Sequence, residues 1–131
     1  MADLISASNA FKAFTDITRI RICRLLMANQ TEMCVCELVD SLEEQQYNVS
    51  KQVKIMETAG ILTKEKEGRW IYYSLNQHNE AFLDALFESV ALIEDINEQL
   101  AGDQRRFEAR MKLREDGRCK VGILQKELTT S

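Results

Sequence analysis

The chain has 131 residues, a length typical of one domain, and its 45% hydrophobic and 29% charged residues exclude wholesale disorder. It begins without the basic and apolar regions of a secretion signal, and no apolar run reaches the about 18 residues that cross a bilayer. We therefore expect a cytoplasmic protein with no membrane partner. A single histidine, His78, excludes a metal site built on two imidazoles of one chain. With no Gly-rich phosphate loop and no Ser/His/Asp set, we expect no enzyme.

Charge is distributed unevenly along the chain, although the formal net charge is only −4. Residues 76–104 carry seven acidic and no basic side chains, whereas residues 105–120 carry seven basic and three acidic ones. Residues 44–75 carry five basic and four acidic side chains. This middle stretch is therefore free to approach phosphate, but we expect any DNA binding to be sensitive to salt and to depend on a dimer.

Three helices are predicted in the first third of the chain. Apolar residues recur at helical spacing over 4–14, and a second helix is predicted over 17–27 after an N-cap at Asp16. A third helix follows Thr31, its predicted N-cap. Its apolar stripe is formed by Val35, Leu38, Val39 and Leu42.

A fourth helix is predicted over 48–58, with Asn48 as its N-cap and Gly60 just past its C-terminal end. Only a short polar turn separates it from the third helix. Two short helices joined in this way are typical of a helix-turn-helix.

A β-hairpin is predicted directly after the fourth helix. Its strands cover 62–66 and 70–75, and Glu67-Gly68 supplies the turn. A helix-turn-helix followed by a hairpin predicts a winged helix, with Arg69 at the tip of the wing.

The fourth helix and the wing carry the side chains that we expect to contact DNA. Exposed residues at the start of such a helix reach base edges in the major groove, and basic residues meet phosphates. The alternative for this polar face alone is the solvated surface of an ordinary helical domain, and the hairpin with its basic tip favours DNA. The predicted contacts are Tyr47, Asn48, Ser50, Lys51, Gln52, Lys54 and Arg69.

One long helix is predicted from Asn79 through Leu100. At about 1.5 Å per residue it would span about 33 Å, more than so small a domain needs to cover its own core. We therefore expect part of its apolar surface to pack against a second copy of the chain. The predicted division is a winged-helix DNA-binding and dimerisation domain over 1–102 and a basic C-terminal extension over 103–131 that carries Cys119.

Five stretches of the chain match a family pattern: Thr18-Arg19-Ile20-Arg21-Ile22, Cys34-Val35-Cys36-Glu37-Leu38, Val49-Ser50-Lys51-Gln52-Val53-Lys54, Ala59-Gly60-Ile61-Leu62 and Gly68-Arg69-Trp70-Ile71-Tyr72-Tyr73-Ser74-Leu75. Together they resemble the ArsR/SmtB family of winged-helix repressors. The resemblance implies a mainly α fold with a β-hairpin, dimeric through its terminal helices. It also implies a homodimer that represses transcription at a palindromic operator and releases the DNA when an inducer binds.

The pair Cys34 and Cys36, at the head of the third helix, resembles the thiol motif of the family's arsenite and soft-metal sensors. Thiolates select soft ions, and three of them satisfy a trivalent arsenic centre. The expected inducer is therefore As(III) or Sb(III). Residues two positions apart on an intact helix project about 200° apart. We therefore expect the pair to hold one ion only if the start of the helix unwinds or shifts, which would move the helix-turn-helix with it.

Cys119 is the predicted third ligand, delivered within one subunit or across the dimer. It lies between Arg118 and Lys120, cations that are expected to stabilise a thiolate. Cys23 lies on the core stripe of the second helix and is interpreted as packing. Zinc on the predicted long helix is not expected, because that helix contains no histidine.

Other thiol functions stay open from the sequence. On the same fold, the cysteines would serve a redox or persulfide switch, or a repressor that senses cadmium or lead. A thiol oxidoreductase is disfavoured, because its usual Cys-x-x-Cys motif and parallel-strand pattern do not occur in the sequence.

Overall fold

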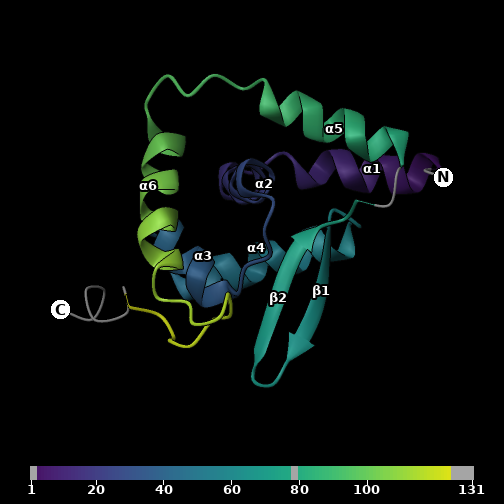
Figure 1. Cartoon of the computed structure of the whole chain (residues 1–131). Helices are drawn as coiled ribbons and strands as arrows, with labels where there is room; N and C mark the ends of the chain where they lie inside the picture. The colour runs from purple at the N-terminus through teal and green to yellow at the C-terminus, as the bar shows by residue number, and fades with distance from the viewer. Residues whose placement is uncertain (1–2, 78–79, 125–131) are drawn as a thin grey trace.

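A computed structural model describes residues 3–77 and 80–124 of the chain, so the single histidine, His78, and the predicted start of the long helix, Asn79, lie outside the described residues. The described elements are α1 (Leu4–Ala13), α2 (Ile17–Asn29), α3 (Val35–Leu42), α4 (Gln46–Thr58), β1 (Leu62–Glu67), β2 (Trp70–Leu75), α5 (Ala81–Ala91) and α6 (Gln99–Met111). Figure 1 shows the hairpin projecting from one side of the helices, with α5 lying along α1. No helix within the described ranges is both long and apolar enough to span a bilayer.

The predicted helix-turn-helix is confirmed, with changes at the helix starts. Asp16 caps α2 as predicted, since its carboxylate accepts the Arg19 N–H at 3.1 Å. The prediction that Thr31 caps α3 is wrong, because Cys34 occupies the N-cap position in an extended conformation. The prediction that Asn48 caps α4 is also wrong, because α4 already begins at Gln46 and Asn48 lies in its first turn.

The predicted wing is confirmed as an antiparallel pair whose register runs from Leu62↔Leu75 to Glu67↔Trp70. The prediction that Glu67-Gly68 supplies the turn is wrong, because Glu67 still pairs with Trp70 and the turn consists of Gly68 and Arg69. The positive φ of 59° at Gly68 suits the tight turn. The base of the wing is fastened to the segment before α3. Two backbone hydrogen bonds make this connection, from Met33 N to Tyr73 O at 2.9 Å and from Tyr73 N to Met33 O at 2.8 Å.

The prediction of one long helix through Leu100 is wrong, because α5 ends at Ala91 and α6 begins only at Gln99. Arg24 of α2 closes the end of α5, donating to Val90 O at 3.1 Å and to Ile93 O at 2.8 Å. Asp95 then opens α6, because its carboxylate accepts the N–H groups of the first helical turn at 2.9 and 2.8 Å. Side chains therefore hydrogen-bond the free carbonyl groups at the end of α5 and the free N–H groups at the start of α6, and these bonds stabilise the break between the two helices.

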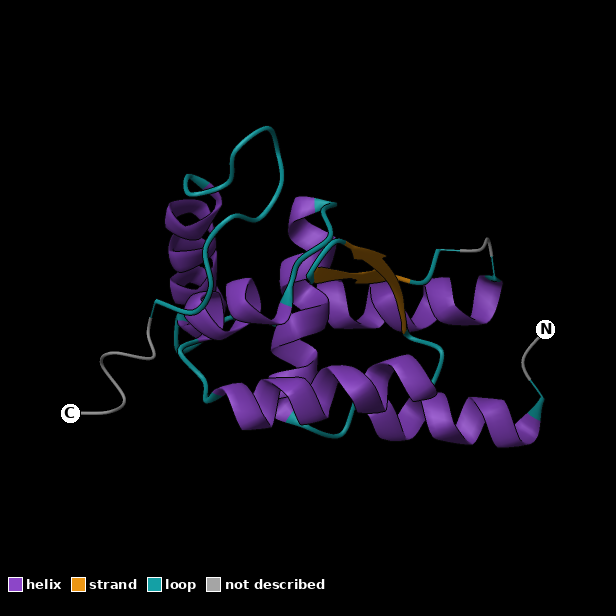
Figure 2. Ribbon diagram, turned by 90° about the horizontal axis from the view of Figure 1, so that it is seen from below, coloured by secondary structure: helices purple, strands orange, loops and turns teal. Residues whose placement is uncertain are grey.

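After the break, the chain turns back towards the helix-turn-helix. Figure 1 shows α6 standing beside α3, and the segment after α6 continues towards the hairpin, as Figure 2 also shows. The predicted boundary at residue 102 falls inside α6, and residues 103–124 lie against the winged helix through ion pairs with α3. This return path is the feature of the fold that assembles the thiol site.

Candidate thiol site and DNA interface

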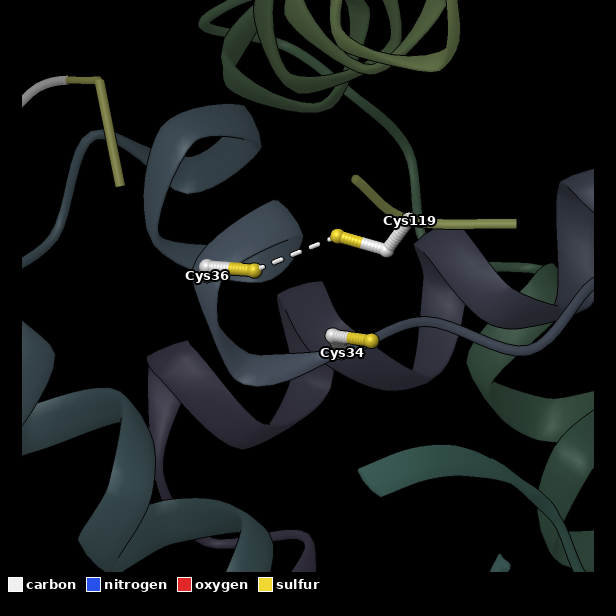
Figure 3. Close-up of side chains that lie close together, drawn as sticks. All are labelled: Cys34, Cys36 and Cys119. Carbon is white, nitrogen blue, oxygen red and sulfur yellow. Dashed lines mark hydrogen bonds between the residues drawn. The ribbon is translucent and has the colours of Figure 1, made fainter. Parts of the chain in front are cut away.

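Three cysteine sulfurs from distant parts of the chain meet in the interior. The Sγ atoms of Cys34, Cys36 and Cys119 all lie within 4.8 Å of one another, and all three residues are buried (Figure 3). The Sγ atoms of Cys36 and Cys119 are 3.6 Å apart. Cys23 lies elsewhere in the main core, with its Sγ 3.6 Å from the Met27 sulfur, which confirms its interpretation as packing.

The sulfurs meet while α3 stays helical. Cys34 precedes the first helical residue and has φ −79° and ψ 160°, so the helical spacing of side chains does not apply to it. Cys36 lies in the first turn of α3 and points towards the same space (Figure 3). The prediction that both sulfurs can face one ion only after the helix start unwinds or shifts is therefore wrong.

Cys119 reaches this space from its own chain, through contacts that fasten residues 110–124 to α3. Arg110 Nε lies 2.7 Å from Asp40 Oδ2, and its Nη2 donates to the carbonyls of Val121 and Gly122 at 2.7 and 3.0 Å. The Cys119 N–H donates to the Tyr72 hydroxyl at 2.9 Å. The sulfur is therefore held between α3 and strand β2.

A second contact acts at the start of α3. The Glu37 carboxylate accepts the Cys34 N–H at 3.0 Å and pairs with the Arg114 guanidinium at 2.7 and 2.8 Å. One buried carboxylate thus orients the N-cap cysteine and anchors the returning segment, which fixes two of the three sulfur positions.

The three thiols do not ionise alike. The pKa of Cys36 is lowered to about 7, first because the Cys34 thiol hydrogen-bonds to it, with further help from Cys119 and Arg110. The same hydrogen bond to Cys36, together with burial, raises the pKa of Cys34. Burial raises the pKa of Cys119 to about 11. A hydrogen bond to a charged group favours its ionised form, so Cys36 carries the first thiolate.

The prediction that the neighbours of Cys119 stabilise its thiolate is wrong. Arg118 turns away from the sulfur: its guanidinium lies 3.8 Å from the centre of the Tyr72 ring and pairs with Glu32 and Glu67. Lys120 is exposed. Burial therefore affects the pKa of Cys119 more than the flanking positive charges do.

This donor set suits a soft ion that takes three sulfurs. Among the described residues, only these three cysteines form a cluster of candidate ligands, and the neighbouring Glu37 carboxylate already has partners. Structural zinc takes four ligands in tetrahedral geometry, whereas trivalent arsenic is satisfied by three thiolates. The residues present therefore fit a three-coordinate thiophilic ion.

Most of the predicted DNA-contacting residues are exposed, whereas Asn48 is half-buried and Gln52 is buried. Along α4, the exposed members are Tyr47, Ser50, Lys51 and Lys54, and Arg69 is exposed at the wing tip, 4.6 Å from the Trp70 ring centre. Gln52 is only 5% exposed. Its amide donates to Asn48 Oδ1 at 2.9 Å and accepts from Arg19, so it lies behind the exposed face and holds Asn48.

Sequence reasoning missed several residues that build these sites. Lys12 and Arg19 line a groove of about 710 Å³ together with Lys51 and Lys54, which adds positive charge beside α4. At the thiol site, Tyr72, Arg110 and Arg114 were not singled out. The basic composition of 105–120 was the available signal, but it gave no indication of the buried carboxylates that these arginines meet.

Comparison with known proteins gives matches centred on the helix-turn-helix. Residues 16–64, which include Cys34 and Cys36, match the family described as "Bacterial regulatory protein, arsR family". The arsenic resistance transcriptional regulator ArsR1 of Pseudomonas putida is 36% identical over 90 residues, covering 69% of this chain and 70% of that protein. The cadmium resistance regulatory protein CadC homolog of Staphylococcus aureus is 30% identical over 84 residues, covering 63% and 69% respectively.

Among solved structures, a homodimeric winged helix-turn-helix DNA-binding domain from Mycobacterium bovis, a possible ArsR-family regulator, aligns with a TM-score of 0.59. It covers 70% of this chain and 88% of its own at 21% identity. A likeness at this identity supports the winged-helix fold.

Proposed function

The chain belongs to the ArsR family of winged-helix transcriptional regulators, and from that premise we propose that it is a cytoplasmic repressor relieved by trivalent arsenic. In this proposal a homodimer binds operator DNA through α4 and the wing. As(III), or Sb(III), binds the thiolates of Cys34, Cys36 and Cys119, and the repressor then leaves the DNA.

The convergence of the three sulfurs within 4.8 Å is the observation that carries the choice of ligand. Cys36 belongs to α3, the first helix of the helix-turn-helix, so an ion held there acts directly on a DNA-binding element. A coupling of about 1–3 kcal/mol between ligand and DNA is typical and would weaken operator binding about 5- to 150-fold.

Exposed apolar side chains support the homodimer. Leu4 is 90% exposed, and Leu92 and Ile96 in the connection between α5 and α6 are each 81% exposed. Large apolar groups in contact with water are characteristic of surfaces that another protein covers. We propose that a second copy covers part of this surface in solution.

A redox switch is the second candidate, favoured by the 3.6 Å separation of the Cys36 and Cys119 sulfurs. In that case a peroxide would convert the Cys36 thiolate to a sulfenic acid, and the Cys119 thiol would displace water to form a disulfide. A repressor that responds to cadmium is the third candidate function, supported by the similarity to the CadC homolog.

The deciding experiment titrates the reduced protein, bound to a labelled operator, with arsenite, antimonite, cadmium or peroxide. Release by arsenite in the presence of a reductant that contains no thiol supports the proposal. Release only by peroxide, reversed by reductant, supports the redox switch instead. A protein that keeps its operator at arsenite concentrations that saturate all three thiols would refute the arsenic-responsive repressor.

A further inference from the structure

The wing takes part directly in the thiol site. Tyr72 lies in the middle of strand β2, and its buried side chain packs in one cluster with Cys34, Cys36 and Cys119. Its hydroxyl accepts the Cys119 N–H at 2.9 Å. A residue of the DNA-binding hairpin is thus hydrogen-bonded to the backbone of the proposed third ligand.

Arg118 makes a second connection, at the far end of the hairpin. Its Nε donates to Glu67 Oε2 at 2.9 Å, its Nη2 lies 2.6 Å from Glu67 Oε1, and its guanidinium covers the Tyr72 ring. Glu67 is the last residue of β1 and faces Trp70 across the turn that carries Arg69. A two-point contact of this kind fixes orientation as well as distance.

We propose that Arg118 and Tyr72 are positioning residues through which occupancy of the thiol site controls the wing. This inference rests on the proposed function of the three thiols. An ion bound by Cys34, Cys36 and Cys119 sets the position of the Cys119 backbone. Because Arg118 is the preceding residue and Tyr72 accepts the Cys119 N–H, a change in that backbone reaches the middle of strand β2 through Tyr72 and the turn of the hairpin through Glu67.

The wing connection differs from the route through α3. In the α3 route, the ion would act on DNA binding through Cys34 and Cys36 alone, and the contact between Arg118 and Glu67 would have no effect on release. In the wing route, that contact carries part of the response. Substitution of Glu67 separates the two, because Glu67 lies on the hairpin and touches none of the sulfurs.

The chain provides a matched pair of variants and a built-in reporter. Glu67→Gln removes the wing side of the contact, and Glu65→Gln removes the same charge from an exposed position of the same strand. Each variant removes one negative charge from β1 and so changes the general repulsion from DNA equally. A difference in operator release between the two variants therefore reports on the contact between Arg118 and Glu67. Trp70 is the single tryptophan of the chain and packs against the Tyr72 cluster, so its fluorescence reports on the wing.

The experiment uses the full-length reduced protein and arsenite as the probe. It measures arsenite binding by loss of free thiol, operator affinity with and without saturating arsenite, and Trp70 emission. For Glu67→Gln, we expect arsenite binding like that of the wild type, a smaller change in Trp70 emission, and an arsenite-induced loss of operator affinity reduced by about two- to fivefold. Glu65→Gln should behave like the wild type.

The outcomes separate this inference from the function on which it rests. If the wild type releases its operator in arsenite and Glu67→Gln responds as fully as Glu65→Gln, the wing route is overturned and the arsenic-responsive repressor stands. If the wild type binds no arsenite, or binds it and keeps the operator, the proposed function is overturned together with the wing route.

Discussion

Glu37 and Arg114 form a two-point ion pair in the interior, with N–O distances of 2.7 and 2.8 Å between side chains that are 0% and 9% exposed. The pair joins the first turn of α3 to the segment that carries Cys119. The same carboxylate accepts the Cys34 N–H, so Glu37 positions Cys34 directly and Cys119 through Arg114. The proposed ligand site is therefore organised around a contact that contains no sulfur.

Replacing Glu37 with Gln should destabilise the protein strongly. The neutral amide leaves the Arg114 charge buried without its counterion, and breaking a buried pair in this way costs about 3–5 kcal/mol. The free energy of unfolding, measured by urea denaturation, tests this, with Glu65→Gln as the exposed control. A loss below about 1 kcal/mol would show that the pair does not hold the returning segment.

Serine variants of the three clustered cysteines should lose arsenite binding, whereas Cys23→Ala should keep it. Loss of a supporting contact around a metal typically costs about 10- to 100-fold in affinity, so loss of a ligand should cost at least as much. Arsenite affinity is followed by competition with a thiol-reactive dye. Cys119→Ser binding arsenite as tightly as wild type would remove this residue from the site while leaving Cys34 and Cys36 in place.

Arsenite affinity should change little below about pH 7 and fall as the pH rises above it. Arsenite reacts as As(OH)3, and each hydroxyl leaves as water with the proton of one thiol, so a cysteine that is already a thiolate must take up a proton when it binds. The pKa of Cys36 is lowered from 9.0 to about 7, so its thiolate forms from neutral pH upward and makes binding dependent on protons there. Because the folded pKa is the lower one, this thiolate stabilises the fold fully above about pH 9, and its contribution is lost as the pH falls through 7.

The thiolate absorbance of the reduced protein checks this assignment. One group should titrate near pH 7 in the wild type and be missing in Cys36→Ser. A first thiolate that forms only above pH 9 in the wild type would contradict the lowered pKa.

Lys51→Gln should weaken operator binding and its dependence on salt. Lys51 is exposed on α4, and each lost phosphate contact lowers the slope of log affinity against log salt by about one. For a dimer, the expected reduction is therefore about two. Lys112→Gln, an exposed position after α6, is the matched control. Equal slopes for the two variants would mean that Lys51 does not meet a phosphate.

The helix-turn-helix and the wing could be predicted from the sequence because short-range signals set them. The stripe of Leu38, Val39 and Leu42 and the turn at Gly68 each act within a few residues. The break between α5 and α6 had no such signal. It depends on Arg24, which lies 66 and 69 residues before the carbonyls it meets.

The thiol site could be predicted in its members but not in its geometry. The resemblance to the family's thiol motif pointed to Cys34 and Cys36, and the flanking cations favoured Cys119 as the third ligand. Their arrangement depends on Cys34 lying before the helix rather than inside it, and on Arg110 meeting Asp40 from 70 positions away. Helical spacing alone therefore gave the wrong relation between Cys34 and Cys36.

The proposed third sulfur comes from 83 positions beyond Cys36, outside the helix-turn-helix and the hairpin. The proposed DNA-contacting residues and the proposed third ligand thus lie in separate stretches of the chain. If the proposed function holds, changes after residue 110 would alter the response to the ion while the proposed DNA-contacting residues keep their identity. The inducer and the operator could then change independently during evolution.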